Sequence, residues 1–348
     1  MNKYQVFVKL FKTFYLKILM TEKNRKMGLS GLLNLGNSCF LNSIIQCLNY
    51  SYEFGEFLNN DKLEVKDDSN GKMLIEYNEL RKLMTSKNCI ISPKRFYKYF
   101  MDCAKENGRD NFLDFQQNDA GECLQFLLEM FHNTLSRSVS IDIKGKIEGI
   151  QDKIAKECFS SHKNFYENDY SELLNIFSAI QVTKVIDKKT NKMSSVVCEP
   201  FMTLMLPIPT KGKNESIQLE DCFDLFATEE NLENHIKSTQ FWSFPNTLII
   251  ILNRFYNSNL RKNQICVEFN HNNVLDLSKY VIGYNAKKFK YKLYAVCNHT
   301  GALEGGHYSS YIKCNKWYHF NDNVIEELGK HKIVSQKAYI LFFKKIET

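Results

Sequence analysis

The stretch that decides the fold of this chain is Gly31-Leu32-Leu33-Asn34-Leu35-Gly36-Asn37-Ser38-Cys39-Phe40-Leu41-Asn42-Ser43-Ile44-Ile45-Gln46. Glycine and small polar residues precede Cys39, and apolar residues follow it at helical spacing. Cys39 is therefore predicted to be the first residue of a buried helix. Unpaired backbone N–H groups and the positive end of the helix dipole favour a thiolate there. The alternative is a buried cysteine that packs as a small hydrophobic residue.

A second polar group falls near the C-terminus. Strands are predicted over residues 291–297 and 307–312, separated by a glycine-rich loop from Asn298 to Gly306, and a third strand follows a turn. His307 then begins one strand of a hairpin and Asn321 ends its partner, so the two side chains are expected side by side. A nucleophilic cysteine needs such a base and a residue that orients it. Taken alone, a histidine is more often structural or on the surface.

A third segment precedes an apolar run in the first half of the chain. Asp119 lies three residues before Glu122, which is a reciprocal capping pattern and predicts a helix start. A purely structural N-cap is therefore an alternative to any binding role. Both roles are compatible, because a helix start can cap itself and still present a carboxylate.

These three segments resemble the cysteine, Gln-x-Asp-Ala and histidine boxes of the ubiquitin-specific proteases, and they occur in that family's order. The resemblance extends over residues 28–343 and includes the buried strand predicted within residues 244–255. Mild departures from the family pattern are Ser38, Phe40, Ile45, Gly121 and Cys123.

The resemblance implies a site. Cys39 takes the position of the nucleophile, His307 that of the base and Asn321 the third position, where the family has Asp or Asn. Asn34 would stabilise the oxyanion, and Asp322 matches an adjacent acidic position. A turn residue is the alternative for Asn34, and a solvated turn carboxylate is the alternative for Asp322.

The implied substrate is ubiquitin joined through its C-terminal glycine to another protein. The reaction would hydrolyse a thioester, isopeptide or peptide bond after that glycine. The residues expected to face the ubiquitin tail are Asp119, Glu122, Gly305, Gly306 and Tyr308. Two rivals are a catalytically silent ubiquitin-binding scaffold and a protease for another ubiquitin-like modifier.

The implied fold is that of a papain-like α+β cysteine protease over residues 28–347. A helical thumb is expected at about 28–170, reduced fingers at about 171–244 and an antiparallel β palm at about 245–347. The family's fingers usually bind zinc through two Cys-x-x-Cys pairs, and this sequence has none. Zinc-free fingers and no metal or organic cofactor are therefore expected.

Composition bounds the other possibilities. The 348 residues are 44% hydrophobic, which suits a globular chain with a substantial core. The net charge of +7 comes from scattered basic residues, so nucleic acid is not an expected partner. Eleven cysteines without a disulfide pattern favour a reducing intracellular compartment, the cytoplasm or nucleus, rather than secretion.

Residues 1–27 differ from the rest as an N-terminal extension. The first twenty contain no acidic residue, and their polar positions gather on one side of a helical wheel. Contact of residues 1–20 with a membrane surface is one interpretation. A poorly ordered extension is the other.

Overall fold

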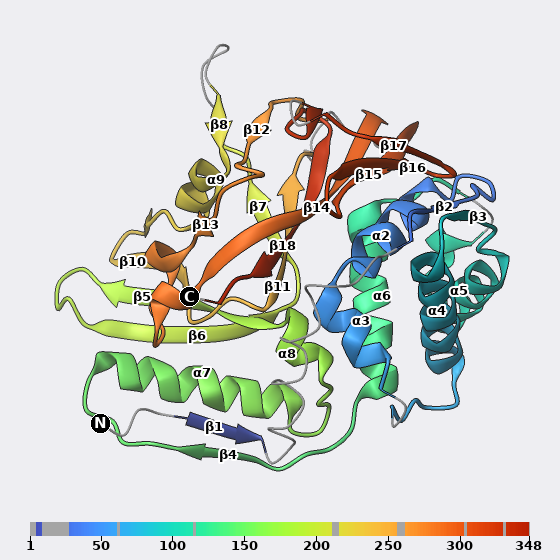
Figure 1. Cartoon of the computed structure of the whole chain (residues 1–348). Coiled ribbons are helices and arrows are strands. Elements are labelled where there is room, and N and C mark those ends of the chain that lie inside the picture. The colour runs from blue at the N-terminus through green and yellow to red at the C-terminus, as the bar shows by residue number, and fades with distance from the viewer. Residues whose placement is uncertain are drawn as a thin grey trace.

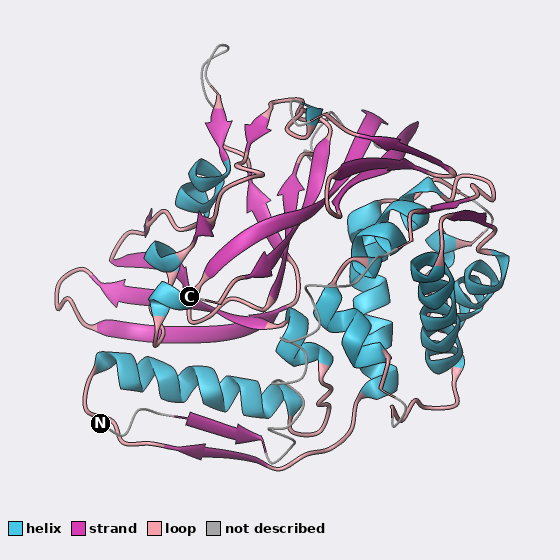
Figure 2. Ribbon diagram, in the orientation of Figure 1, coloured by secondary structure: helices cyan, strands magenta, loops and turns pink. Residues whose placement is uncertain are grey.

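The computed structural model describes residues 5–8, 28–60, 63–113, 116–210, 216–255, 262–302, 305–329 and 332–347. Figure 1 shows a group of helices on one side, a large twisted sheet beside them, and a smaller sheet underlain by one long helix. Most helices lie in the first half of the chain and most strands in the second, and Figure 2 shows most of the helices gathered to one side of the large sheet. This is the predicted α+β architecture.

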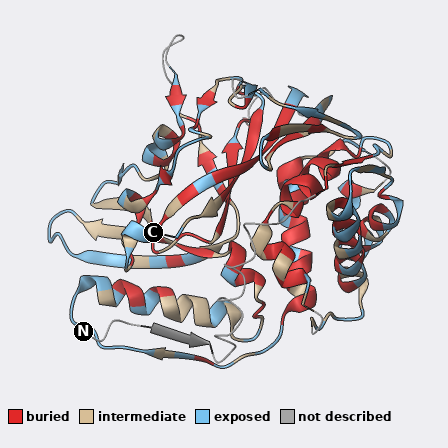
Figure 3. Ribbon diagram, viewed as in Figure 1, coloured by how far each residue is buried: buried red, intermediate tan, exposed pale blue. Residues whose placement is uncertain are grey.

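The helical group contains α2 (Cys39–Asn49), α3 (Tyr52–Leu58), α4 (Ser69–Ser86), α5 (Lys94–Glu106), η2 (Asp110–Phe112) and α6 (Ala120–Leu135). The short strands β2 (Ser30–Leu32) and β3 (Cys89–Ile91) pair in parallel beside it. Helix α2 begins at Cys39, as predicted, and all eleven of its residues are buried. It contacts both α6 and the large sheet, and Figure 3 shows this region of the molecule as mostly buried.

The large sheet has the order β17-β16-β15-β14-β18-β11-β7, with β13 paired to β14. The strands are β7 (Leu204–Pro207), β11 (Thr247–Asn253), β13 (Leu275–Asp276), β14 (Lys290–Ala302), β15 (Gly305–Lys313), β16 (Trp317–Asn321), β17 (Val324–Glu327) and β18 (Ala338–Lys345). All neighbours are antiparallel except β11 and β7.

Strand β11 explains why this sheet has two buried faces. Ile249 and Ile251 contribute to the core shared with the helices, whereas Leu248, Ile250 and Leu252 contribute to a second core on the opposite face. Alternate side chains of a strand point to opposite faces, so a continuous apolar run can serve both cores. The strand predicted within residues 244–255 is confirmed.

The second core also receives helix α9 (Leu219–Phe226) and the parallel pair formed by β8 (Ile217–Gln218) and β12 (Val267–Glu268). Two short 3₁₀ turns, η3 (Ser278–Tyr280) and η4 (Ala286–Lys288), precede β14. Among the described residues, no helix has the length and apolar character needed to cross a membrane.

The smaller sheet, called here the finger sheet, has the order β6-β5-β10-β9. Its strands are β5 (Ala179–Asp187), β6 (Met193–Phe201), β9 (Glu230–Asn231) and β10 (His235–Phe241). Helix α7 (Ile150–Tyr166) packs against β5 and β6, and α8 (Leu173–Phe177) leads into β5 (Figure 1). The predicted finger range, 171–244, also includes β7, β8 and α9, because the chain crosses to the large sheet between β6 and β9.

An amphipathic helix was one of the two interpretations of residues 1–20, but Gln5–Val8 form strand β1, antiparallel to β4 (Ile141–Lys144). A helical wheel describes only the spacing of side chains within one segment. It does not include the backbone hydrogen bonds that a strand gains by pairing with β4. The rest of that prediction lies outside the described residues.

We expect the finger sheet to be independent of zinc. Within the described part of the chain, no group of three or more His, Cys, Asp or Glu side chains is arranged to hold a metal ion. An apolar cluster joins α7 to β5 and β6 instead. Because structural zinc contributes folding energy directly, a chelator unfolds proteins that depend on it. Excess EDTA should leave the melting temperature unchanged, and about one zinc per chain by elemental analysis would contradict the expectation.

Candidate active site

The turn before Cys39 is held by its own side chains. Asn34 Oδ1 accepts hydrogen bonds from the backbone N–H groups of Gly36, at 3.0 Å, and Ser38, at 3.2 Å. Gly36 and Asn37 have φ angles of 102° and 51°, a left-handed conformation that glycine and asparagine adopt most readily. This is the turn role considered for Asn34. Its Nδ2 group remains directed elsewhere, to Asp322.

The sulfur of Cys39 lies in a buried position at the start of α2. The side chain is 5% exposed, and burial raises the pKa of the Cys39 thiol above its usual range. The backbone N–H of Tyr308 lowers this pKa and the negative charge of Asp322 raises it, but burial has the larger effect. The expected preference for thiolate is therefore wrong for this structure, because desolvation outweighs the stabilising N–H groups.

His307 and Asn321 meet as the hairpin predicted. The Nε2 atom of His307 and the Oδ1 atom of Asn321 are 2.5 Å apart, on strands β15 and β16. The predicted loop before His307 is mostly strand, however. β14 extends to Ala302, and Gly301 pairs with Gly306. Gly301 has a φ of 112°, a conformation that favours glycine, so a glycine is needed at this position of the β14–β15 pair.

Helix α2 packs against β15, which places Cys39 beside the strand that carries His307. The Cys39 sulfur lies near the backbone N–H of Tyr308, which is the residue after His307 on β15. Among the contacts of the described residues, the His307 ring bonds to Asn321, and no hydrogen bond joins it to the Cys39 sulfur. His307 is exposed while Cys39 is buried.

Asp322 is the centre of a hydrogen-bond network below this turn. Its Oδ2 accepts from Asn34 Nδ2 at 3.0 Å, and its Oδ1 accepts from Asn42 Nδ2 at 2.8 Å. Its backbone oxygen accepts from the N–H of Leu32 at 2.9 Å. Asp322 thus lies in the turn between β16 and β17, and both of its carboxylate oxygens are held by side-chain amides. Asn42 was not predicted as part of the site, because it is one of several buried polar residues on α2 and the sequence alone does not show which of them reaches Asp322.

Asp119 caps α6, as its spacing predicted. Its Oδ1 accepts from the backbone N–H groups of Gly121, at 2.7 Å, and Glu122, at 3.0 Å. The hydroxyl of Tyr339 also donates to Asp119, at 2.8 Å, as does that of Tyr308, at 3.3 Å. Tyr308 is 6% exposed, so its ring packs inside the protein rather than facing solvent. No hydrogen bond from the Glu122 side chain to this cap appears among the described contacts, and Glu122 is exposed.

The two glycines before His307 have different surroundings. A Cβ atom on Gly306 would lie 2.2 Å from His299 Nε2 and 2.8 Å from the Thr300 oxygen, so only glycine fits. Gly305 has open space around it. The Gly306 N–H donates to Gln117 Oε1 at 2.7 Å and so joins the segment before α6 to β15. Gln117 was not predicted to belong to this site.

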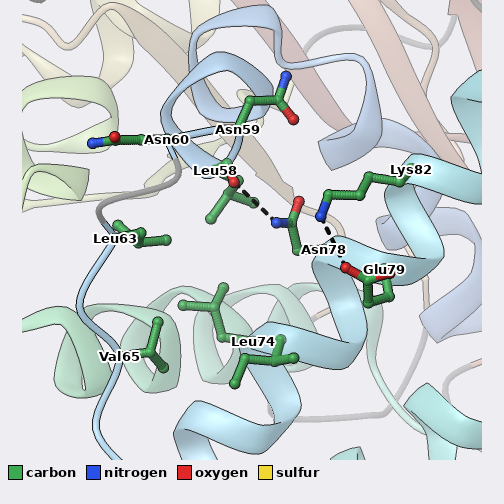
Figure 4. A pocket seen from close by; sticks show the side chains of 10 residues that line it. Leu58, Asn59, Asn60, Leu63, Val65, Leu74, Asn78, Glu79 and Lys82 are labelled. Carbon is green, nitrogen blue, oxygen red and sulfur yellow. Dashed lines mark hydrogen bonds and ion pairs between the residues drawn. The ribbon is translucent and has the colours of Figure 1, made fainter.

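A surface hollow of about 430 Å³ lies elsewhere, between α3 and α4. Its lining includes Leu58, Leu74 and Asn78 (Figure 4), and none of the residues above contributes to it. The Asn78 side chain bonds to the Leu58 oxygen across this hollow. The hollow is therefore separate from the candidate active site.

Comparison with known proteins gives consistent matches. The family model described as ubiquitin carboxyl-terminal hydrolase matches residues 30–343. Ubiquitin carboxyl-terminal hydrolase Usp2 of Drosophila melanogaster is 31% identical over 93% of this chain and 36% of its own length. Ubiquitin carboxyl-terminal hydrolase 2 of Homo sapiens is 30% identical over 91% of this chain and 55% of its own length. The chain thus spans between about a third and just over half of these relatives.

Solved structures give the same fold. A chain of the SAGA Ubp8/Sgf11/Sus1/Sgf73 DUB module bound to ubiquitin aldehyde aligns with a TM-score of 0.69 at 20% identity, over 96% of this chain and 73% of that one. Another structure of the SAGA Ubp8/Sgf11/Sus1/Sgf73 DUB module gives a TM-score of 0.67 at 21% identity, over 96% of this chain and 72% of that one. The predicted papain-like α+β fold is confirmed.

Proposed function

Since this chain belongs to the ubiquitin carboxyl-terminal hydrolase family, we propose that it is a cysteine protease that hydrolyses the bond after the C-terminal glycine of ubiquitin. The substrates are thioesters, isopeptides or peptides of ubiquitin, including ubiquitinated proteins. The observation that carries the proposal is the His307–Asn321 pair on strands packed beside the helix that begins at Cys39.

In the proposed reaction the Cys39 sulfur attacks the carbonyl carbon of the terminal glycine. His307 takes the thiol proton and delivers it to the leaving amine, and then activates water against the thioester. Burial raises the pKa of the Cys39 thiol, so the proposed role of His307 is to accept the thiol proton as the sulfur attacks. Asn321 accepts a hydrogen bond from the ring and fixes its direction.

Asn34 is proposed to stabilise the oxyanion, together with backbone N–H groups near Cys39. Its Oδ1 is already used by the turn and its Nδ2 by Asp322. Asp322 therefore sets the direction of the amide that donates to the developing charge. This makes Asp322 a positioning residue in the proposal.

The ubiquitin tail is proposed to pass between the segment before α6 and β15. Gly305 has open space for a narrow tail. The neighbouring Gly306 N–H is bonded to Gln117, which fixes β15 against the segment before α6. The exposed carboxylate of Glu122 suits a basic residue of the tail. The carboxylate of Asp119 accepts hydrogen bonds from Tyr308 and Tyr339, so its position beside the proposed path of the tail is fixed.

The remaining organisation is proposed on the same basis. The helical group forms the thumb, the finger sheet grips ubiquitin, and the large sheet is the palm. The enzyme is proposed to work in a reducing intracellular compartment without a cofactor and without nucleic acid as a partner. Membrane contact by residues 1–20 concerns segments that are mostly outside the described residues.

The direct assay is steady-state hydrolysis of a fluorogenic C-terminal amide of ubiquitin, compared with the same leaving group on other ubiquitin-like modifiers. Turnover of the ubiquitin amide alone supports the proposal. Turnover of another modifier alone would assign the second rival, and binding of ubiquitin without any turnover would assign the silent scaffold.

Asn321→Ala is expected to lower kcat about 100-fold, because orientation of a catalytic group commonly contributes factors of this size. Asn321→Asp should retain activity, since a carboxylate accepts the same hydrogen bond from His307. The fluorogenic assay measures both variants. Near-parental kcat in Asn321→Ala, combined with an almost inactive Asp322→Ala, would move the third role to Asp322.

A further inference from the structure

A pair of thiols joins α7 to the finger sheet, outside the candidate active site. The sulfur of Cys158 on α7 donates a hydrogen bond to the sulfur of Cys198 on β6, at 3.2 Å. Cys158 is 0% exposed and Cys198 is 7% exposed. The two residues are 40 positions apart in the sequence, so their contact is made by the fold.

The surroundings fix these two sulfurs against each other. The cluster around them consists of Ile154, Ala155, Ile180, Val182 and Trp242. Three residues beyond Cys158, the Ser161 hydroxyl donates to the backbone oxygen of Cys198 at 2.5 Å. Helix α7 is thus bonded to Cys198 of β6 twice, once at its sulfur and once at its backbone oxygen. A disulfide has a sulfur–sulfur distance of about 2.05 Å, so the sulfurs need to approach by only about 1 Å.

We propose that Cys158 and Cys198 are a site of oxidative modification, where a hydroperoxide converts the two thiols into a disulfide that ties α7 to β6. The Cys198 thiolate attacks a peroxide oxygen, the O–O bond breaks, and Cys198 becomes a sulfenic acid while hydroxide leaves and takes up a proton. The Cys158 sulfur then attacks the Cys198 sulfur, loses its proton and expels water. Two thiols lose two electrons in total, and one hydrogen peroxide becomes two waters.

The environment assigns the order of these steps. Cys198 has the greater exposure of the two and accepts the hydrogen bond from Cys158. That bond lowers the pKa of Cys198 and raises the pKa of Cys158. Since the thiolate is the reactive form, Cys198 reacts first and the buried Cys158 resolves the sulfenic acid.

The disulfide would close a loop that contains α8, β5 and most of β6. A cross-link between residues this far apart removes conformational freedom from the unfolded chain. The oxidised protein should therefore melt at a higher temperature, by roughly 5–10 °C. This inference concerns the redox chemistry of the chain and does not rest on the proposed hydrolase activity.

The test treats the full chain with hydrogen peroxide, blocks the remaining thiols with iodoacetamide, and digests it with trypsin without reduction. Cleavage after lysine places Cys158 in the peptide 157–163 and Cys198 in the peptide 193–211. Mass spectrometry should find these two peptides linked, and dithiothreitol should separate them. If both cysteines are recovered only as alkylated or over-oxidised residues, the proposal is overturned.

Matched variants give a second readout. Cys198→Ser keeps the size of the side chain and should abolish both the linked peptide and the rise in melting temperature. Cys222→Ser changes another fully buried cysteine, on α9, and should keep both effects. A rise in melting temperature that persists in Cys198→Ser would show that a different oxidation stabilises the protein and would contradict the proposal.

Discussion

Cys39→Ala is expected to reduce turnover of a ubiquitin C-terminal amide by at least about 10⁴-fold, because removing a catalytic nucleophile commonly costs this much or more. The fold and most of the affinity for ubiquitin should remain. The thiol occupies one position at the start of α2, and the ten residues that follow it in that helix are also buried. The measurement is kcat with the fluorogenic amide, together with binding of intact ubiquitin.

Cys47→Ala is the matched control. Cys47 lies on the same helix and is 0% exposed, so its replacement also leaves a small buried space. It should keep kcat within a few-fold of the parent while losing similar or greater stability. Equal loss of turnover in the two variants would assign the effect to packing of α2 and not to a nucleophile.

Asp322→Ala is expected to lower kcat by about 10²- to 10³-fold, corresponding to roughly 3–4 kcal/mol of barrier. The substitution frees the amides of Asn34 and Asn42, both of which donate to this carboxylate. Asn34 then loses the partner that directs its Nδ2 group. KM should change much less than kcat, because the oxyanion develops only during the reaction.

Asp322→Asn separates charge from backbone conformation. Asp322 has a φ of 52°, which asparagine tolerates better than alanine does. The asparagine retains one acceptor oxygen and places an N–H₂ group against the second donor, so an intermediate loss of kcat is expected. Equal kcat in the parent and in both variants would refute the positioning role.

The sequence predicted the parts of the site that depend on local pattern. Glycine and polar residues before an apolar helical run placed Cys39 at a helix start, and the hairpin pattern placed His307 beside Asn321. The prediction that Cys39 favours the thiolate was wrong because the pKa of Cys39 depends on how deeply the thiol is buried in the folded protein, which no local sequence pattern reports. The sequence indicated the helix start, whose dipole and N–H groups lower the pKa of Cys39. It did not indicate the desolvation that raises this pKa by more.

Pairing in three dimensions explains the other differences. Residues 298–306 have the glycine content of a loop, yet most of them are paired strand, because Gly301 and Gly306 allow a close hairpin. The Tyr308 hydroxyl donates to Asp119, a support for this carboxylate that the sequence did not predict, and its expected contact with substrate stays a prediction. The roles of Asn42 and Gln117 depend on partners at least 180 residues away in the sequence.

The central claim is that Cys39 attacks the C-terminal carbonyl of ubiquitin, and covalent trapping tests it most directly. The parent protein and Cys39→Ala would be incubated with ubiquitin that carries a thiol-reactive group in place of its C-terminal carboxylate. Intact mass and peptide mapping would then locate the adduct among the eleven cysteines. We predict one ubiquitin per parent chain, attached at Cys39, and none on Cys39→Ala. An adduct at any other cysteine, or no adduct on the parent, would contradict the account.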